Sequence, residues 1–281
     1  MLDYRRELFL GVTRIQSVFV GPRRVGTGTG FWIRLASGQA CFVTNRHNLD
    51  PSLNFPDQPD LHLETASIEL RRSYGIDEGE PSYDSETRYF ELDETQSKIF
   101  ALDNADCAVV MPKFKESTEG FSICAPFDES DLADEDFFQT TLMPIHEVYF
   151  IGFPGRGAYF QLGKTEIPWW DTKWNLPITR SAVVASMPFL QFHNERIKTG
   201  DVLLVSGMSF KSSSGSPVIS KQIGFRVTPP LKCDYIPEKL VGIMSGHWWA
   251  GNDDSGNPIH GGLSYFTRSP SILHLIRSNG L

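Results

Sequence analysis

Residues 212–219, Ser-Ser-Ser-Gly-Ser-Pro-Val-Ile, join a turn of small residues directly to an apolar strand. Acyl transfer needs a serine oxygen at an exposed bend whose neighbouring backbone N–H groups are not committed to a β-ladder. Ser214 is the best placed hydroxyl in this turn. An ordinary turn before a strand has the same composition, so the segment indicates chemistry only in combination with partners elsewhere in the chain.

Short runs of β-branched and aromatic residues recur between clusters of glycine, proline, asparagine and aspartate. They predict strands over 13–20, 30–35, 39–44, 63–70, 98–102, 107–111, 147–151, 181–185, 201–205, 217–219, 239–244 and 263–267. Because no helical period separates these runs, barrels or sandwiches are favoured over βαβ units. One helix is predicted at the end of the chain, with Ser269 as its cap, Pro270 in its first turn and an apolar face that ends before Gly280.

A second signal lies in the first half of the chain. Residues 28–33 and 41–47 read as neighbouring strands of a meander, and the second of them ends at His47. A general base must be held on rigid scaffold and still reach its substrate, which a strand end provides. The glycine-threonine run 26–30 precedes a strand rather than a helix, which argues against a phosphate-binding loop. A surface or structural histidine is the alternative interpretation of His47.

A third signal is residues 103–111, where an acid, Asp106, opens an apolar strand whose interior offers no basic partner. A carboxylate on an imidazole N–H fixes the tautomer of the ring and stabilises the imidazolium. Alternation places Asp106 and the small Ala108 on one face of the strand, which leaves room for a carboxylate directed at His47. Asp103 belongs to the preceding turn and is expected to be solvated. A solvated acid is the alternative for Asp106 as well.

The three segments together resemble the motifs of bacterial trypsin-like serine peptidases. The histidine motif is similar to residues 43–47, the acid motif to residues 106–109 and the nucleophile motif to residues 214–218, in the order His, Asp, Ser. Further similarities are residues 26–31, residues 151–154 at the start of the second barrel, and residues 242–246 on the strand that flanks the substrate. The resemblance covers about residues 12–278.

The resemblance implies an all-β, chymotrypsin-like fold of two six-stranded antiparallel β-barrels with a C-terminal α-helix. Residues 1–145 would form the barrel that carries His47 and Asp106, and residues 146–281 the barrel that carries Ser214. It also implies a serine endopeptidase. His47 would take the proton of Ser214 during attack on a peptide carbonyl and return it to the leaving amine, and water would hydrolyse the acyl-enzyme.

The same resemblance assigns the residues that would bind substrate. Ser245 would lie near Asp106, and the backbone of Ser245, Gly246 and His247 would pair with an extended peptide. Met208, six residues before the nucleophile, takes the position that is often deep in the primary pocket, and His247 would stand at the rim. Since no acid is evident at the base of this pocket, an apolar or small substrate side chain is favoured over Lys or Arg.

The oxyanion hole is where the sequence departs from the family. Its donors would be the N–H groups of Ser212 and Ser214, but the family usually has glycine in place of Ser212, and a Cβ restricts the backbone rotations that aim the N–H. A catalytically latent or inactive protein that binds a peptide or protein partner is therefore the main alternative, and a hydrolase of small esters is a third. Neither activation by trypsin-like zymogen cleavage nor a PDZ domain after the peptidase is expected.

Composition limits the classes of partner. The 281 residues are 40% hydrophobic and 21% charged, as in ordinary globular proteins, which predicts a compact fold. A net charge of −8, with acidic clusters in 77–94 and 128–136, argues against a nucleic-acid partner. These clusters are expected to be solvated loops, with docking of a basic partner as the alternative. The sequence shows neither a signal peptide nor a long apolar run, so neither export nor a membrane span is expected.

The four cysteines, Cys41, Cys107, Cys124 and Cys233, are scattered and lack metal-ligand spacing. Free thiols are expected, which fits a cytoplasmic protein. No metal and no cofactor is expected. The expected partners are a peptide or protein substrate and, by analogy, an unidentified regulatory protein. The aromatic segment 168–174 is expected to be a loop packed on the second barrel, with a partner-binding exosite as the alternative.

Overall fold

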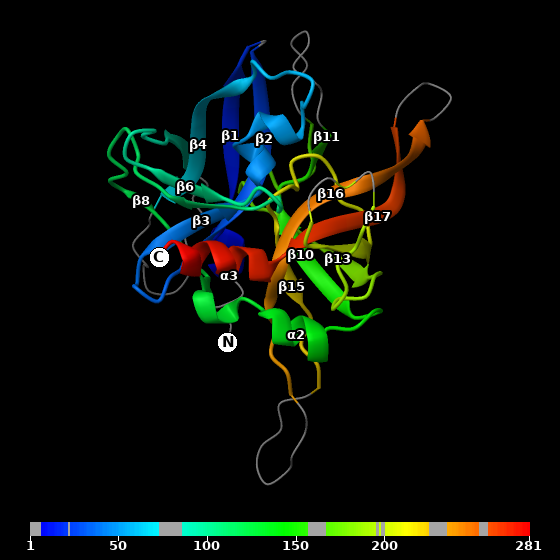
Figure 1. Cartoon of the computed structure of the whole chain (residues 1–281). Helices are drawn as coiled ribbons and strands as arrows, with labels where there is room; N and C mark the ends of the chain where they lie inside the picture. The colour runs from blue at the N-terminus through cyan, green and yellow to red at the C-terminus, as the bar shows by residue number, and fades with distance from the viewer. Residues whose placement is uncertain are drawn as a thin grey trace.

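The computed structural model of the chain describes residues 7–21, 23–72, 86–156, 167–194, 197, 200–224, 235–252 and 258–281 (Figure 1). Cys233 and the first half of the acidic run 77–94 lie outside these residues. No helix in the described part of the chain is long and apolar enough to cross a membrane.

The first half of the chain forms one sheet. Its main path runs through β5 (Thr87–Glu91), β4 (His62–Arg72), β1 (Val12–Val20), β2 (Arg24–Arg34), β3 (Ala40–Thr44), β7 (Ala108–Met111) and β6 (Lys98–Ala101). Two short strands, β8 (Phe121–Ser122) and β9 (Phe127–Asp128), pair with β4 and β2. Among the described residues the sheet has nine strands and no pairing between β5 and β6. This half therefore differs from the closed six-stranded barrel expected from the sequence.

The second half forms a closed barrel in the order β10-β13-β14-β17-β16-β15, six strands within the described residues. These strands are β10 (Glu147–Gly152), β13 (Ile178–Val184), β14 (Val202–Ser206), β17 (Pro258–Arg268), β16 (Leu240–Asn252) and β15 (Pro217–Ser220). A two-stranded sheet of β11 (Gly155–Arg156) and β12 (Ile167–Pro168) follows β10. β16 and β17 continue past the barrel as a projecting ribbon (Figure 1). The all-β fold of two units with a C-terminal helix is thus confirmed, although β9 pairs with β2 in parallel rather than antiparallel.

The two halves share a hydrophobic core. Phe31 and Val109 from the first half, Phe153 and Ile243 from the second, and Ile272 from α3 (Ser269–Ser278) are all fully buried in one cluster. The helix α3 contacts both β7 and β16 (Figure 1). Because this apolar surface is buried only when the halves are joined, it holds them in a defined relative position. The boundary near residue 145 remains a prediction.

The helices differ from the sequence expectation in two details. Arg268, not Ser269, is the N-cap residue of α3, and the Ser269 hydroxyl donates a hydrogen bond to the Ala133 carbonyl at 2.6 Å. Ser269 therefore ties α3 to the segment before α2 (Glu135–Thr140), a helix in a stretch for which the sequence predicts no helix. Asp134 caps α2 by accepting the Phe137 N–H at 3.0 Å. The short 3₁₀ turns are Arg46–Asn48, Pro51–Leu53 and Glu129–Asp131.

Alternation along β2 explains its repeated glycines. Gly26, Gly28 and Gly30 share one face of the strand. A Cβ at Gly28 would lie 2.4 Å from the Asn48 side chain, and one at Gly30 would lie 2.1 Å from the Phe42 ring. Gly28 and Gly30 therefore have to be glycine, because the neighbouring side chains already fill the space of a Cβ.

We predict that Gly30→Ala destabilises the protein by about 1–3 kcal/mol, because the fully buried Phe42 ring has to move. Gly26→Ala on the same face is the matched control. Its Cβ would meet only the edge of the Phe19 ring at 3.2 Å, so its stability should stay within about 1 kcal/mol of wild type. Urea denaturation of the three proteins measures both effects. Equal losses in the two variants would contradict this account of the β2 face.

Candidate active site

The pairing of β3 with β7 brings the predicted base and acid together. Thr44 lies opposite Ala108 in the antiparallel ladder, so the residues after β3 and those before β7 leave the sheet at the same edge. His47 lies in the 3₁₀ turn that follows β3, and Asp106 lies two residues before β7. The acid thus precedes the strand instead of opening it as the sequence analysis had it.

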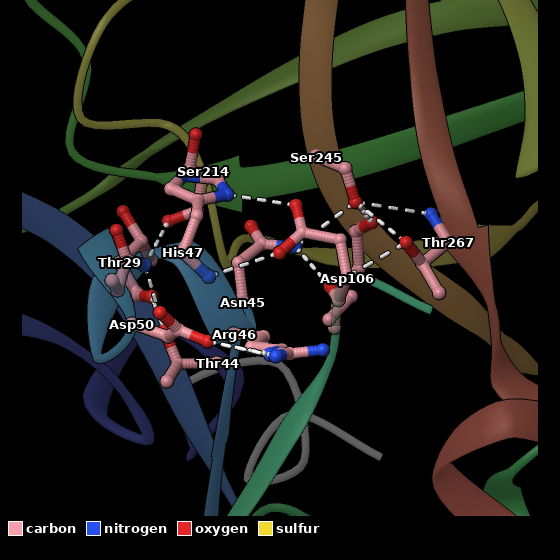
Figure 2. Close-up of polar contacts among 12 residues, drawn as sticks. Thr29, Thr44, Asn45, Arg46, His47, Asp50, Asp106, Ser214, Ser245 and Thr267 are labelled. Carbon is pink, nitrogen blue, oxygen red and sulfur yellow. Dashed lines mark hydrogen bonds and ion pairs between the residues drawn. The ribbon is translucent and has the colours of Figure 1, made fainter. Parts of the chain in front are cut away.

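His47 and Asp106 make two contacts (Figure 2). His47 Nδ1 lies 2.7 Å from Asp106 Oδ2, and the His47 backbone N–H donates to Oδ1 at 3.0 Å. The His47 and Asp106 side chains are 13% and 9% exposed. A carboxylate at Nδ1 favours the tautomer that carries its proton there, which leaves Nε2 as the acceptor. The imidazole is therefore oriented and has the electronic form of a general base.

Asp103 lies in a different environment. Its side chain is fully exposed, and its nearest charged neighbour is Arg46, whose Nη1 lies 3.3 Å from Oδ1. Exposed ion pairs of this kind contribute little to stability. The geometry places Asp106, and not Asp103, beside the histidine.

Ser245 on β16 belongs to the hydrogen-bond network around Asp106. Asn45 Nδ2 donates both to the Asp106 carbonyl at 2.7 Å and to Ser245 Oγ at 2.9 Å, and Ser245 Oγ lies 2.8 Å from Thr267 Oγ1 (Figure 2). Ser245 is only 5% exposed, so its hydroxyl serves this internal network rather than the surface. Sequence reasoning missed Asn45 and Thr267 as supports. Asn45, inside the histidine motif, was the available signal.

The Ser214 backbone is held by the first half of the chain. Its carbonyl accepts the Thr29 N–H at 2.8 Å and Asn48 Nδ2 at 3.3 Å. Among the described residues, neither the Ser214 hydroxyl nor its N–H makes a hydrogen bond, and no bond joins Ser214 to His47. The hydroxyl and the N–H of the half-buried Ser214 are therefore both available to contact a ligand.

Ser212 adopts a left-handed backbone conformation with φ 64°. For a residue with a Cβ this conformation costs about 1–2 kcal/mol. Two threonines of β2 hold it in place, since Thr29 Oγ1 donates to the Ser212 carbonyl at 2.7 Å and Thr27 Oγ1 lies 2.8 Å from Ser212 Oγ. The serine found where the family usually has glycine is thus fixed in a backbone region that favours glycine.

The edge of β16 beyond Met244 has no strand partner among the described residues. β15 pairs with β16 as far as Ile243, and Met244 exchanges hydrogen bonds with the turn that precedes β15. Gly246 and His247 pair with β17 on the other side. A Cβ on Gly246 would lie 2.5 Å from the Tyr265 hydroxyl, which explains the glycine.

Met208 differs from the pocket residue suggested by the resemblance. Its side chain is 51% exposed rather than deep, and its backbone carbonyl accepts from Arg180 Nη1 at 3.4 Å. His247 lies nearby, with Ser209 Oγ 3.3 Å from its Nδ1. Of the described residues proposed for substrate binding, Ser245, Gly246 and His247 share the β16 edge, while Met208 lies on the loop before the nucleophile.

Aromatic rings surround His247. It stacks on His260 at 4.9 Å and meets Trp249 edge-on at 4.2 Å. Burial lowers the pKa of His247 to about 4, and the neighbouring His260 and Lys211 act in the same direction. Burial also lowers the pKa of His260. Both rings are therefore neutral at pH 7 and form part of an apolar surface.

The aromatic segment 168–174 packs against two phenylalanines of the second half of the chain. Trp170 meets Phe153 of the shared core at 5.8 Å, and Trp169 meets Phe210 at 4.7 Å. Trp169 and Trp174 remain 44% and 37% exposed. The packing agrees with a loop held on the barrel, the interpretation favoured from the sequence.

Comparisons with known proteins find the fold but no close sequence relative. No family model and no curated protein matches the chain. The HtrA-type protease AlgW with a tripeptide aligns with 99% of this chain and 62% of its own, at 11% identity and a TM-score of 0.50. Similarity at this identity establishes the fold alone. The chain therefore has the fold of trypsin-like, HtrA-type proteases, as the motif resemblance implied.

Two other solved structures align over nearly the whole chain. The MamO protease domain of Magnetospirillum magneticum in its apo form is 13% identical over 99% of this chain and 98% of its own, with a TM-score of 0.47. The Rv3671c protease of M. tuberculosis in its active form is 12% identical over 98% of this chain and 82% of its own, with a TM-score of 0.46.

We predict that His247 makes the protein less stable in acid. Folded His247 takes up a proton near pH 4, whereas the unfolded side chain does so near 6.5, so the unfolded state binds more protons between these values. Its stabilising effect is complete above pH 6.5 and is lost as the pH falls toward 4. The stability lost between pH 7 and pH 4.5 should be about 1–2 kcal/mol smaller in His247→Gln, after allowance for partial solvent exposure.

Urea denaturation at the two pH values measures this difference. His62→Gln, at an exposed position of β4, is the control for loss of a histidine. The same pH dependence in His247→Gln as in wild type would refute the prediction.

Proposed function

We propose that this protein is a serine endopeptidase in which Ser214 is the nucleophile, His47 the general base and Asp106 the acid that orients His47. The observation that carries the proposal is the double contact of Asp106 with His47, at 2.7 and 3.0 Å. The Ser214 hydroxyl and N–H have no hydrogen-bond partner among the described residues. Such a constellation supports acyl transfer.

The chemistry follows from the orientation of His47. Nε2 takes the proton of the Ser214 hydroxyl while Oγ attacks the carbonyl carbon, and Asp106 stabilises the imidazolium through Nδ1. The tetrahedral intermediate collapses when the imidazolium protonates the amine that leaves. Water then attacks the acyl carbon and gives a proton to His47, and the imidazolium returns that proton to Ser214 Oγ as the acid product leaves.

The N–H groups of Ser212 and Ser214 are the proposed donors to the oxyanion. Donors fixed before the reaction stabilise developing charge without reorganisation, which supports a role for the restrained Ser212 conformation. A peptide would add as a strand along the free edge of β16 at Ser245, Gly246 and His247. This strand edge favours peptide substrates over small esters, which offer no ladder of backbone groups.

A latent or inactive protein that binds a peptide or protein is the second candidate. It is favoured by the missing hydrogen bond between Ser214 and His47 among the described contacts and by a serine at position 212, where the family usually has glycine. In that case the β16 edge would hold a partner without cutting it.

The proposal also places the protein in the cytoplasm, where a regulatory protein would control it. The free thiols of Cys41, Cys107 and Cys124 support the cytoplasmic location. Burial raises the pKa of Cys124 to about 11 and that of the more deeply buried Cys41 to about 12, so both thiols stay protonated and inert near neutral pH.

A fluorophosphonate probe separates the two candidates. The wild type should be labelled stoichiometrically at Ser214 and should digest casein, because an activated hydroxyl attacks both reagents. Ser214→Ala should show neither reaction while its circular dichroism and unfolding midpoint match wild type. Ser213→Ala is unsuitable as a control because Ser213 is buried in the same turn, so Ser220→Ala on β15 is used.

Absence of labelling in wild type would select the binding protein. Labelling with ester hydrolysis but no cleavage of casein or peptides would select the small-ester hydrolase. Persistent cleavage by Ser214→Ala would place the nucleophile elsewhere.

The identity of the acid is tested by two matched variants. Asp106→Asn should lower kcat by on the order of 10⁴, because an amide at Nδ1 favours the wrong tautomer. Asp103→Asn should lower it by about tenfold at most, because that side chain is fully exposed and faces Arg46. Both values are measured with one peptide substrate. Equal or reversed losses would show that the assignment of Asp106 is wrong.

A further inference from the structure

Arg180 on β13 is a largely buried cation without an acidic partner among the described residues. Its guanidinium lies over the Phe150 ring at 4.4 Å and near the Phe210 ring at 5.6 Å, and its Nε is buried without a hydrogen bond. Burial lowers its pKa to about 10. An uncompensated charge in such a place is unfavourable, so its contacts with the surrounding loop need an explanation.

The principal contact of Arg180 is the residue directly before the proposed nucleophile. Arg180 Nη2 donates to Ser213 Oγ at 2.7 Å, and Nη1 donates to the Met208 carbonyl at 3.4 Å. Ser213 is fully buried, and its N–H donates to the Phe210 carbonyl at 3.1 Å. Charge-assisted hydrogen bonds of this type are stronger than neutral ones and fix direction as well as distance.

Ser213 stands between the two proposed oxyanion donors. The first half of the chain holds Ser212 through Thr27 and Thr29, as described above. Arg180 holds Ser213 from the side of the second barrel. The strained Ser212 conformation is thus restrained from both directions, and removal of either restraint frees the loop to relax to ordinary φ values.

We propose that Arg180 is a positioning residue that keeps residues 210–216 in the conformation with the Ser212 and Ser214 N–H groups aligned for an oxyanion. It acts through Ser213 Oγ and does not touch the substrate. The catalytic part of this inference rests on the proposed peptidase function, whereas the effect on loop conformation does not.

The structural part is tested by hydrogen exchange and mass spectrometry of the full chain. Arg180→Met should raise exchange in a peptide that spans 209–217 by about tenfold, with the β10 and β14 peptides unchanged. Arg180→Lys should restore part of the protection because it keeps a charged donor. Arg88→Met is the matched control, since Arg88 also lies over a phenylalanine ring, at 5.3 Å, but on the exposed side of the first half.

Ser213→Ala removes the acceptor and leaves the cation in place, so it gives the same test if Arg180→Met fails to fold. The effects of Arg180→Met and Ser213→Ala on exchange should not be fully additive in the double variant, because both substitutions break the same hydrogen bond between Arg180 and Ser213. Unchanged exchange at 209–217 in folded variants, or fully additive effects, would overturn the proposal whether or not the protein is a peptidase.

The catalytic part is tested by steady-state kinetics with neutral peptides and with matched peptides that carry acidic side chains. Arg180→Met should lower kcat by about 10²-fold and change KM by less than about threefold, because a misaligned oxyanion site affects the transition state more than the bound substrate. Arg180→Lys should recover part of kcat, and Arg88→Met should match wild type. A loss confined to peptides with acidic side chains would instead make Arg180 a substrate-binding residue and overturn the positioning role.

Discussion

The arrangement of the site depends on the close approach of Thr29 to the loop that holds Ser214. The Thr29 N–H binds the Ser214 carbonyl at 2.8 Å, its hydroxyl binds the Ser212 carbonyl at 2.7 Å, and a Cβ on Gly215 would lie 1.8 Å from its carbonyl oxygen. Gly215 has φ 92° and leaves the room for this contact. Because His47 and Asp106 belong to the first half and Ser214 to the second, this contact sets the separation between base and nucleophile.

A network of buried polar side chains supports the acid of the site, although Asn45 Oδ1 has no hydrogen-bond partner among the described residues. Asn45, Ser245 and Thr267 hold the Asp106 backbone, and Asp106 in turn accepts two hydrogen bonds from His47. Buried networks of this kind are rigid when their members are paired, and rigidity is what a preorganised catalytic site needs. Within this site the Ser212 backbone is strained, with φ 64°. Strain of this kind persists only where the surrounding contacts hold the residue in place.

Strand patterns predicted most of the fold, but they missed the two-residue strands, β5, α2 and the projecting parts of β16 and β17. β5 is rich in charged residues because it lies at the edge of the sheet, and α2 lies within an acidic stretch that resembles a solvated loop. The projecting parts of β16 and β17 contain glycine, tryptophan and histidine, which do not alternate as a half-buried strand does. Local propensity is a weak guide in such places because edge position and long-range pairing decide the outcome.

The sequence by itself determined the all-β class, the terminal helix and the three segments that carry His47, Asp106 and Ser214, because alternation and small-residue turns are local properties. Only the tertiary structure decided that the first sheet stays open among the described residues and that Arg180 binds Ser213. These outcomes join residues far apart in the chain. Their geometry is set by packing of the two halves, which no local pattern encodes.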